Sequence, residues 1–256
     1  MVYPVPNCGF SRTYVLVADN ELAVVDPGSV GAAQDARRFI EKELRREMRD
    51  LTAVMATHFH IDHIGGIGSF LSCSGPETRV FFHARVRDYV ENKRPISSMK
   101  NWYLGMRPAA WKSVRYLRKA THLMFDSLAG IPLPGIRNLS SLPYDKERIV
   151  YFGGGSERRY PLGFDGWDVI DTPGHTEDSV SFYREATGEL LCGDLIINME
   201  ENGRGRVNRF YSSRAEIMAS FDFLLRTVQA KTVYPGHGDP IRSESNALLG
   251  VETFAK

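Results

Sequence analysis

The sequence predicts a layered α/β fold, because short apolar runs alternate with segments of helical periodicity. Up to about residue 91 the expected order is strand, strand, helix, strand, helix, strand, helix, which is typical of sheets covered by helices. More short apolar runs follow residue 148, while residues 93–144 contain no clear strand. At roughly 100–200 residues per domain, we expect one domain over residues 1–256, with a helical insertion at about 93–144.

The elements of the first half are justified by two periodicities. Alternating or continuous β-branched runs predict strands, and the turn residues Asp19 and Asn20 predict a hairpin between the first two. Apolar residues at Ala36, Phe39 and Ile40 have helical spacing. The expected elements are strands at 13–18 and 21–25, a helix at 32–49, a strand at 51–56, a helix at 67–71, a strand at 78–82 and a helix at 84–91.

The second half is richer in strands. Two of its predicted strands are each followed by a Pro-Gly-His turn, at residues 173–175 and 235–237. The expected elements are strands at 148–152, 168–171, 180–183, 190–192 and 232–234, a helix at 214–228 and a short helix at the C-terminus.

The composition is that of an ordinary globular protein, with 43% hydrophobic and 25% charged residues. Lys and Arg total 32 against 31 for Asp and Glu, so we expect no nucleic-acid partner. Apolar runs are far shorter than the roughly 20 residues of a membrane span, and the start resembles no secretory signal, which predicts a cytoplasmic location. The cysteines, Cys8, Cys73 and Cys192, are too few and scattered for a disulfide framework, and we expect Cys192 to pack in the core.

The residues at 58–63, His-Phe-His-Ile-Asp-His, directly follow the predicted strand 51–56. In extended chain, residues two apart share a face at about 7 Å, so His58 and His60 can converge on one metal ion. A turn at Gly65 and Gly66 could aim Asp62 and His63 together at a second. Imidazole and carboxylate suit zinc, and also iron or manganese.

These residues carry a family resemblance. The chain resembles the metallo-β-lactamase-fold hydrolases, which share a His-x-His-x-Asp-His motif followed by a His, an Asp and a His. The phrases around His175 and His237 look most like the glyoxalase II branch, and Asp26 matches a buried Asp that supports the site. The matching metal ligands are His58, His60, Asp62, His63, His175, Asp194 and His237.

The resemblance implies a four-layer αββα sandwich with the ligands on loops at one edge. It also implies how the ligands divide. One metal would be held by His58, His60 and His175, and the other by Asp62, His63 and His237, with Asp194 and a hydroxide bridging them. The expected cofactors are two divalent ions, zinc first and iron or manganese as alternatives, and the expected catalytic residues are Asp62 and Asp194.

The function implied is a metal-dependent hydrolase that cleaves an ester, thioester or lactone, because paired cations lower the pKa of water and stabilise the developing anion. Fold alone does not choose the substrate. Two alternatives stay open. One is a mononuclear-iron sulfur dioxygenase resembling persulfide dioxygenases, and the other is a phosphodiesterase with the same metal site. Asp194 disfavours the zinc β-lactamases, where a Cys commonly occupies that place.

The insertion is basic and aromatic. Its spacing predicts an amphipathic helix with an apolar stripe that includes Trp111 and Val114 and a charged stripe of Lys112, Arg115, Lys119 and His122. Such a helix could pack with its charged face in water, attract an anionic or acyl-bearing small molecule, meet a membrane or form a homodimer. The aromatic residues expected to line a pocket are Trp102, Tyr103, Trp111 and Tyr116. The candidate proton donors are Tyr103 and Tyr211, whereas His83 and His122 are expected to be ordinary packed residues.

Overall fold

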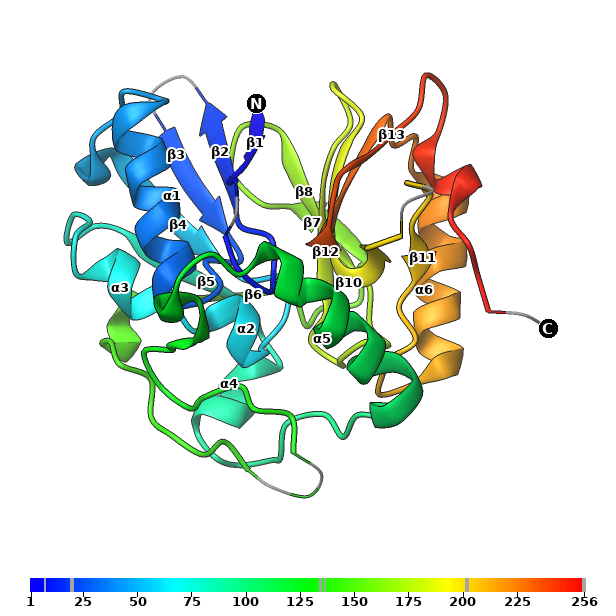
Figure 1. The fold of residues 1–256 in the computed structure, drawn as a ribbon, viewed down its shortest axis with the longest axis horizontal. Coiled ribbons are helices and arrows are strands. Elements are labelled where there is room, and N and C mark those ends of the chain that lie inside the picture. The colour runs from blue at the N-terminus through cyan, green and yellow to red at the C-terminus, as the bar shows by residue number, and fades with distance from the viewer. Residues whose placement is uncertain (7, 19–20, 134, 136, 201–202, 255–256) are drawn as a thin grey trace.

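The protein, described here by a computed structural model, contains two sheets that stand face to face (Figure 1). The structure describes residues 1–256 except 7, 19–20, 134, 136, 201–202 and 255–256. The 6-stranded sheet has the order β1 (Val2–Pro4), β2 (Tyr14–Ala18), β3 (Glu21–Val25), β4 (Leu51–Met55), β5 (Arg79–His83) and β6 (Ile149–Phe152). The 7-stranded sheet has the order β13 (Ile241–Arg242), β12 (Thr232–Gly238), β10 (Glu189–Asn198), β9 (Val180–Arg184), β8 (Trp167–Asp171) and β7 (Arg159–Pro161), with β11 (Arg206–Val207) beside β10.

Helices cover the outer faces of both sheets. In Figure 1, α1 (Val30–Lys42) lies against the first sheet and α6 (Arg214–Thr227) against the second. The remaining α-helices are short: α2 (Ile61–Ile64), α3 (Ile67–Leu71), α4 (Val86–Val90) and α5 (Arg107–Ser113). A π-helical turn covers Trp102–Met106, and 3-10 turns cover Met48–Asp50, Val114–Tyr116, Ala120–Leu123, Lys146–Arg148 and Ala247–Gly250. Among the described residues, no helix is both long and apolar enough to cross a membrane.

Alternation along the strands divides the interior into three apolar layers. In β3, Val24 packs outward among the helices, whereas Ala23 and Val25 point between the sheets. In β9, Phe182 lies between the sheets and Tyr183 packs on the side of α6. Because neighbouring strand residues face opposite sides, each sheet is buried on both faces. The predicted αββα sandwich is therefore confirmed.

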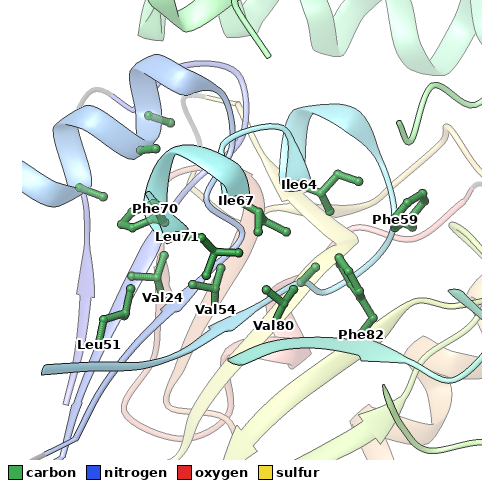
Figure 2. Packing of buried hydrophobic residues seen from close by; sticks show 14 of the residues in the cluster. Val24, Leu51, Val54, Phe59, Ile64, Ile67, Phe70, Leu71, Val80 and Phe82 are labelled. Carbon is green, nitrogen blue, oxygen red and sulfur yellow. The ribbon is translucent and has the colours of Figure 1, made fainter. Parts of the chain in front are cut away.

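The outer layer beside the first sheet shows how its helices are held. Figure 2 shows Ile67, Phe70 and Leu71 of α3 directed toward Val24 and Val54 on the sheet. All five are buried, and burying such side chains stabilises the fold by about 1.5–3 kcal/mol each. This packing fixes the segment between β4 and α3, which carries the His-rich motif.

The helix predicted at 32–49 is shorter than expected. It ends at Lys42, and Arg45 adopts a left-handed conformation with φ 51°. Met48 is nevertheless buried, from a 3-10 turn rather than from the helix. The chain must reverse here to enter β4 at Leu51, and no Gly or Pro marks the turn in the sequence. The hairpin turn expected at residues 19–20 lies outside the described residues.

The prediction of a single amphipathic helix within residues 93–144 is wrong. The helical turns end at Tyr116, Leu117 is extended, and Ala120–Leu123 form a separate 3-10 turn. Like charges at helical spacing disfavour continuation, and His122 is instead bound to α1, with its Nε2 2.8 Å from Asp35 Oδ2. The apolar and charged residues that were predicted to share one helix therefore belong to separate segments.

Candidate metal centre

The predicted ligands come together at one end of the two sheets, from segments that are far apart in the sequence. The loop after β4 supplies His58 and His60, and α2 begins directly afterwards with Ile61. Asp62 and His63 lie in the helical turn α2, which Gly65 caps, so the turn that directs them begins earlier than the expected position at Gly65 and Gly66. The other ligands lie on α2 (Asp62 and His63), after β8 (His175), in β10 (Asp194) and in β12 (His237). Except for the half-buried Asp62, these ligands are buried.

One group of ligand atoms is formed by three histidines. His60 Nδ1 lies 3.1 Å from His58 Nε2 and 3.1 Å from His175 Nε2. The ligand atoms of all three lie within 4.8 Å of one another. Since zinc–nitrogen bonds are about 2.0–2.1 Å long, nitrogen atoms at this spacing can share one ion.

A second group combines Asp62, His63 and His237, whose ligand atoms also lie within 4.8 Å of one another. His237 Nε2 is 3.5 Å from Asp62 Oδ2, and His63 Nε2 is 3.8 Å from the same oxygen. Asp62 is half-buried, so this group is the more exposed half of the site.

Asp194 stands between the two groups. Its Oδ2 lies 3.4 Å from His175 Nε2 in the first group and 3.4 Å from His237 Nε2 in the second, while its Oδ1 lies 3.4 Å from His63 Nε2. A carboxylate with an oxygen close to both groups can serve two cations at once, which is the bridging position expected for Asp194.

The outward ring nitrogens of two histidines are fixed by backbone carbonyls. His175 Nδ1 donates to the carbonyl of Phe210 at 2.7 Å, and His237 Nδ1 donates to the carbonyl of Phe10 at 2.8 Å. Since a carbonyl can only accept, each neutral ring has an unprotonated Nε2 directed into the cluster. Such outer partners set the tautomer of a metal ligand.

Asp26 holds the other side of the cluster. Its Oδ1 accepts from the backbone N–H of Thr57 at 2.8 Å, and its Oδ2 accepts from Thr57 Oγ1 at 2.8 Å. Thr57 Oγ1 in turn lies 3.1 Å from His58 Nδ1. Asp26 Oδ2 is also 3.0 Å from His63 Nδ1. The buried Asp26 therefore contacts both parts of the motif, as the family resemblance implied.

The electrostatics differ between the two groups. Burial and repulsion among neighbouring rings lower the pKa of His58 and His60 well below the ordinary value, so both rings are neutral, the form that binds metal. Burial alone would also lower the pKa of His63. The carboxylates of Asp26, Asp62 and Asp194 outweigh it and raise that pKa well above its usual range, so this side of the cluster attracts positive charge.

The residues fit a metal centre. His63 Nε2 and Asp194 Oδ1 are fully buried and have no hydrogen-bond partner in the described part of the chain. A buried polar atom without a partner costs about 1–3 kcal/mol, and a coordinated cation would remove this cost for both atoms. Imidazole and carboxylate donors suit zinc, iron and manganese.

Three supporting residues were not predicted from the sequence. Asp178 Oδ2 accepts from the backbone N–H of Phe59 at 2.7 Å, which fixes the loop between His58 and His60. Asn208 Nδ2 lies 3.4 Å from Asp194 Oδ2. Ser11 Oγ donates to the carbonyl of Asp62. Asp178 could have been suspected, because it lies in the same turn as His175. Asn208 and Ser11 carry no sequence pattern.

A cavity of about 300 Å³ opens over the cluster, and half of the residues that line it come from residues 93–144, a segment drawn mostly in green in Figure 1. Of the aromatic residues predicted to line a pocket, Trp102 lines this cavity, Tyr103 and Trp111 line an adjoining groove, and Tyr116 lines a separate surface pocket. Tyr211 packs in the core beside α6. Neither tyrosine suggested as a proton donor lines the metal cavity.

Two basic side chains of the predicted charged stripe pair with acids elsewhere in the fold. Lys112 Nζ is 2.6 Å from Glu200, and Lys119 Nζ is 2.7 Å from Asp35. Arg107 is the basic residue of the groove, and its Nη1 donates to Tyr103 Oη at 2.9 Å. The structure therefore does not gather the basic stripe around the cavity.

The Thr57→Val variant tests the support from Asp26. Removing the hydroxyl breaks the link between Asp26 and His58, and loss of such an outer partner lowers metal affinity by about 10–100-fold. Competition with a chromophoric chelator would measure this affinity. Thr78→Val is the matched control, because Thr78 is equally buried and donates to the carbonyl of Leu51, away from the cluster. Equal affinities in the two variants would contradict the role given to Thr57.

Comparisons with known proteins agree with this architecture. The family model described as "Metallo-beta-lactamase superfamily" matches residues 6–80 and 98–237. The probable metallo-hydrolase YqjP of Bacillus subtilis is 24% identical over 236 residues, which cover 89% of this chain and 67% of that protein. A hydroxyacylglutathione hydrolase of Thermosynechococcus vestitus is 32% identical over 102 residues, 40% of this chain and 38% of that protein.

Among solved structures, the BLEG-1 B3 metallo-beta-lactamase superposes with a TM-score of 0.57 at 21% identity, covering 94% of each chain. At this identity the likeness concerns the fold alone. The family match, in contrast, extends over most of the sequence and includes every residue of the cluster. We conclude that this chain belongs to the metallo-beta-lactamase superfamily.

Proposed function

We propose that this protein is a metal-dependent hydrolase that uses two divalent ions to cleave an ester, thioester or lactone. The position of Asp194 carries the proposal. One of its oxygens lies 3.4 Å from a nitrogen of each ligand group, which is what a two-ion site needs and a single-ion site does not. The similarity to a hydroxyacylglutathione hydrolase over part of the chain supports cleavage of a thioester or a related carboxylic ester.

When bound, divalent ions would lower the pKa of water toward about 7 and polarise the scissile carbonyl. The ions would be held by His58, His60 and His175 on one side and by Asp62, His63 and His237 on the other. Zinc is our first expectation, with iron or manganese as alternatives.

The residues of the cavity supply the remaining functions. Asp62 is the least buried of the clustered carboxylates and lines the cavity, so it can accept a proton from the attacking water. Asn208 also lines the cavity, and its Oδ1 accepts from the backbone N–H of Phe210 at 3.0 Å. This bond directs the Nδ2 donor toward Asp194, where it can stabilise an oxyanion.

The largest part of the cavity wall is apolar, including Trp102, Met106 and Leu133. Apolar walls exclude water and strengthen electrostatic interactions with the reacting carbonyl. They offer little to a phosphodiester, whose charge would need basic side chains. This contrast favours a carboxylic ester or thioester over a phosphodiester.

Metal removal tests the proposal directly. Purified protein should contain two ions per chain by elemental analysis and hydrolyse a member of a panel of small esters, thioesters and lactones. Dialysis against a chelator should abolish this activity, and adding zinc, manganese or iron should restore it. Circular dichroism of the same samples would show whether the fold is retained after metal removal.

Other outcomes would contradict the proposal. A single iron per chain with oxygen consumption on a persulfide would indicate a sulfur dioxygenase. Hydrolysis of a phosphodiester in the panel, with all carboxylic esters inert, would indicate a phosphodiesterase. Ester hydrolysis that survives complete metal removal would exclude the two-ion mechanism.

A further inference from the structure

We propose that the groove adjoining the metal cavity binds the apolar acyl chain of the substrate, so that the preferred substrates are long-chain acyl esters or thioesters. This inference rests on the proposed hydrolase function and adds the substrate class. Four features of the described residues support it: continuity with the cavity, the helix face that forms the groove, exposure of apolar side chains, and the scarcity of charge.

The groove is continuous with the cavity over the metal ligands. Phe10, Met106 and Ala110 line both spaces. The inner cavity measures about 300 Å³ and the outer groove about 750 Å³. Since pockets for small molecules span about 300–1,000 Å³, the cavity alone is at the small end of this range, and a long substrate would extend into the groove.

Helix α5 lies between the cavity and the groove, and different faces of the helix line each of them. Ala109 and Ser113, which are one turn apart, face the inner cavity. Arg107 and Trp111, also about one turn apart, line the outer groove together with Val114 of the 3-10 turn that follows the helix. The small side chain of Ala110 lies where the two spaces meet, so a chain can pass along the helix from the metal site to the surface.

The outer groove exposes apolar side chains that the protein itself does not cover. Tyr103 is 70% exposed, Trp111 80% and Val114 52%. Covering apolar surface is worth about 25 cal/mol per Å², and contiguous exposed apolar surface marks binding sites in soluble proteins. An alkyl chain laid along these side chains would remove both its own surface and theirs from water.

Charged side chains are few along this path. The polar ligand residues His60, Asp62, Asp194 and His237 lie on the inner cavity. Of the described residues that line the outer groove, Arg107 alone is charged, and its guanidinium lies 5.1 Å from the centre of the Tyr103 ring. A substrate with one reactive carbonyl and a long uncharged tail matches this distribution.

The chain-length profile of hydrolysis tests the inference. Nitrophenyl esters from acetyl to dodecanoyl would be compared by kcat/KM, and we expect the dodecanoyl ester to be preferred at least about ten-fold. In Trp111→Ala, the ratio of kcat/KM for the dodecanoyl ester to that for the acetyl ester should fall about ten-fold, while Trp111→Phe should restore most of it. Leu249→Ala is the matched control, because Leu249 is 70% exposed and lies in the 3-10 turn Ala247–Gly250, outside the groove.

Binding is measured separately so that the two proposals can fail independently. Calorimetric titration of the metal-loaded protein with dodecanoate should show binding with a negative heat-capacity change, weakened about ten-fold in Trp111→Ala, and no comparable binding of acetate. If dodecanoate binds in this way but no ester is cleaved, the hydrolase proposal fails and the proposal for the groove is retained. If esters are cleaved with a flat chain-length profile that Trp111→Ala does not change, the groove proposal fails and the hydrolase stands.

Two further outcomes would overturn the inference in favour of another occupant. One is a homodimer by light scattering that Trp111→Ala dissociates without altering the chain-length ratio. The other is sedimentation with phosphatidylcholine vesicles that is lost in Trp111→Ala, again with the ratio unchanged.

Discussion

Replacing Asp194 by alanine is expected to empty at least one metal position and to lower kcat/KM about 10³-fold or more, which corresponds to about 4 kcal/mol of transition-state stabilisation. Asp194 is buried, and burial alone would raise its pKa. His237, His175 and His63 outweigh burial and hold that pKa well below its usual range. Its loss would leave both ligand groups without their shared carboxylate, and less negative charge would then screen the repulsion between the two cations.

Elemental analysis and steady-state kinetics on the same preparation would measure this effect. Asp168→Ala is the control, because Asp168 is a partly exposed carboxylate that pairs with Arg159 at 2.7 Å in β7, away from the cluster. That variant should keep its metal and its turnover. Full metal occupancy and near-normal turnover in Asp194→Ala would show that the two-ion mechanism is wrong.

Replacing Gly236 by alanine is expected to disrupt the cluster although Gly236 binds nothing through a side chain. A Cβ at this position would overlap Asp194 Oδ1 and lie 3.0 Å from His63 Cε1. The backbone cannot easily move aside, because Gly236 lies in β12 beside β10 and its carbonyl accepts from the backbone N–H of Arg12 at 2.7 Å. Overpacking at such a site typically costs about 1–3 kcal/mol.

The expected result is a lower midpoint of thermal unfolding together with a loss of bound metal, measured by calorimetry and elemental analysis. Gly155→Ala provides the comparison, since a Cβ there meets nothing within 4 Å and the residue needs no positive φ. Wild-type metal content and stability in Gly236→Ala would show that the site does not depend on the close approach of β12 to Asp194.

Much of the fold could be predicted because it depends on local patterns. The alternation in β3 and β9 that separates the apolar layers is already present in the sequence as runs of Val, Phe and Tyr. The positions of β12 and α6 were likewise expected within a few residues. The short strands β1, β7, β11 and β13 were not predicted, because two or three residues at a sheet edge carry too little pattern to be distinguished from a loop.

Residues 93–144 show where local pattern fails. Apolar residues at helical spacing predicted one amphipathic helix, but the ion pairs of Lys112 with Glu200 and of Lys119 with Asp35 tie its two parts to distant segments. A sequence pattern contains the charge of a lysine but not the position of its partner. The same limitation explains why the basic stripe was expected near the substrate.

The amino-acid sequence by itself determined the family, the layered fold and the ligand candidates, because spacing of two along an extended chain and Pro-Gly-His turns at strand ends are local properties. Only the tertiary structure decided how these ligands meet. Asp194 reaches both groups through its place in β10, and the tautomers of His175 and His237 depend on the carbonyls of Phe210 and Phe10. Those carbonyls belong to every residue type alike, so no sequence pattern can reveal them; packing of distant segments alone brings them to the rings.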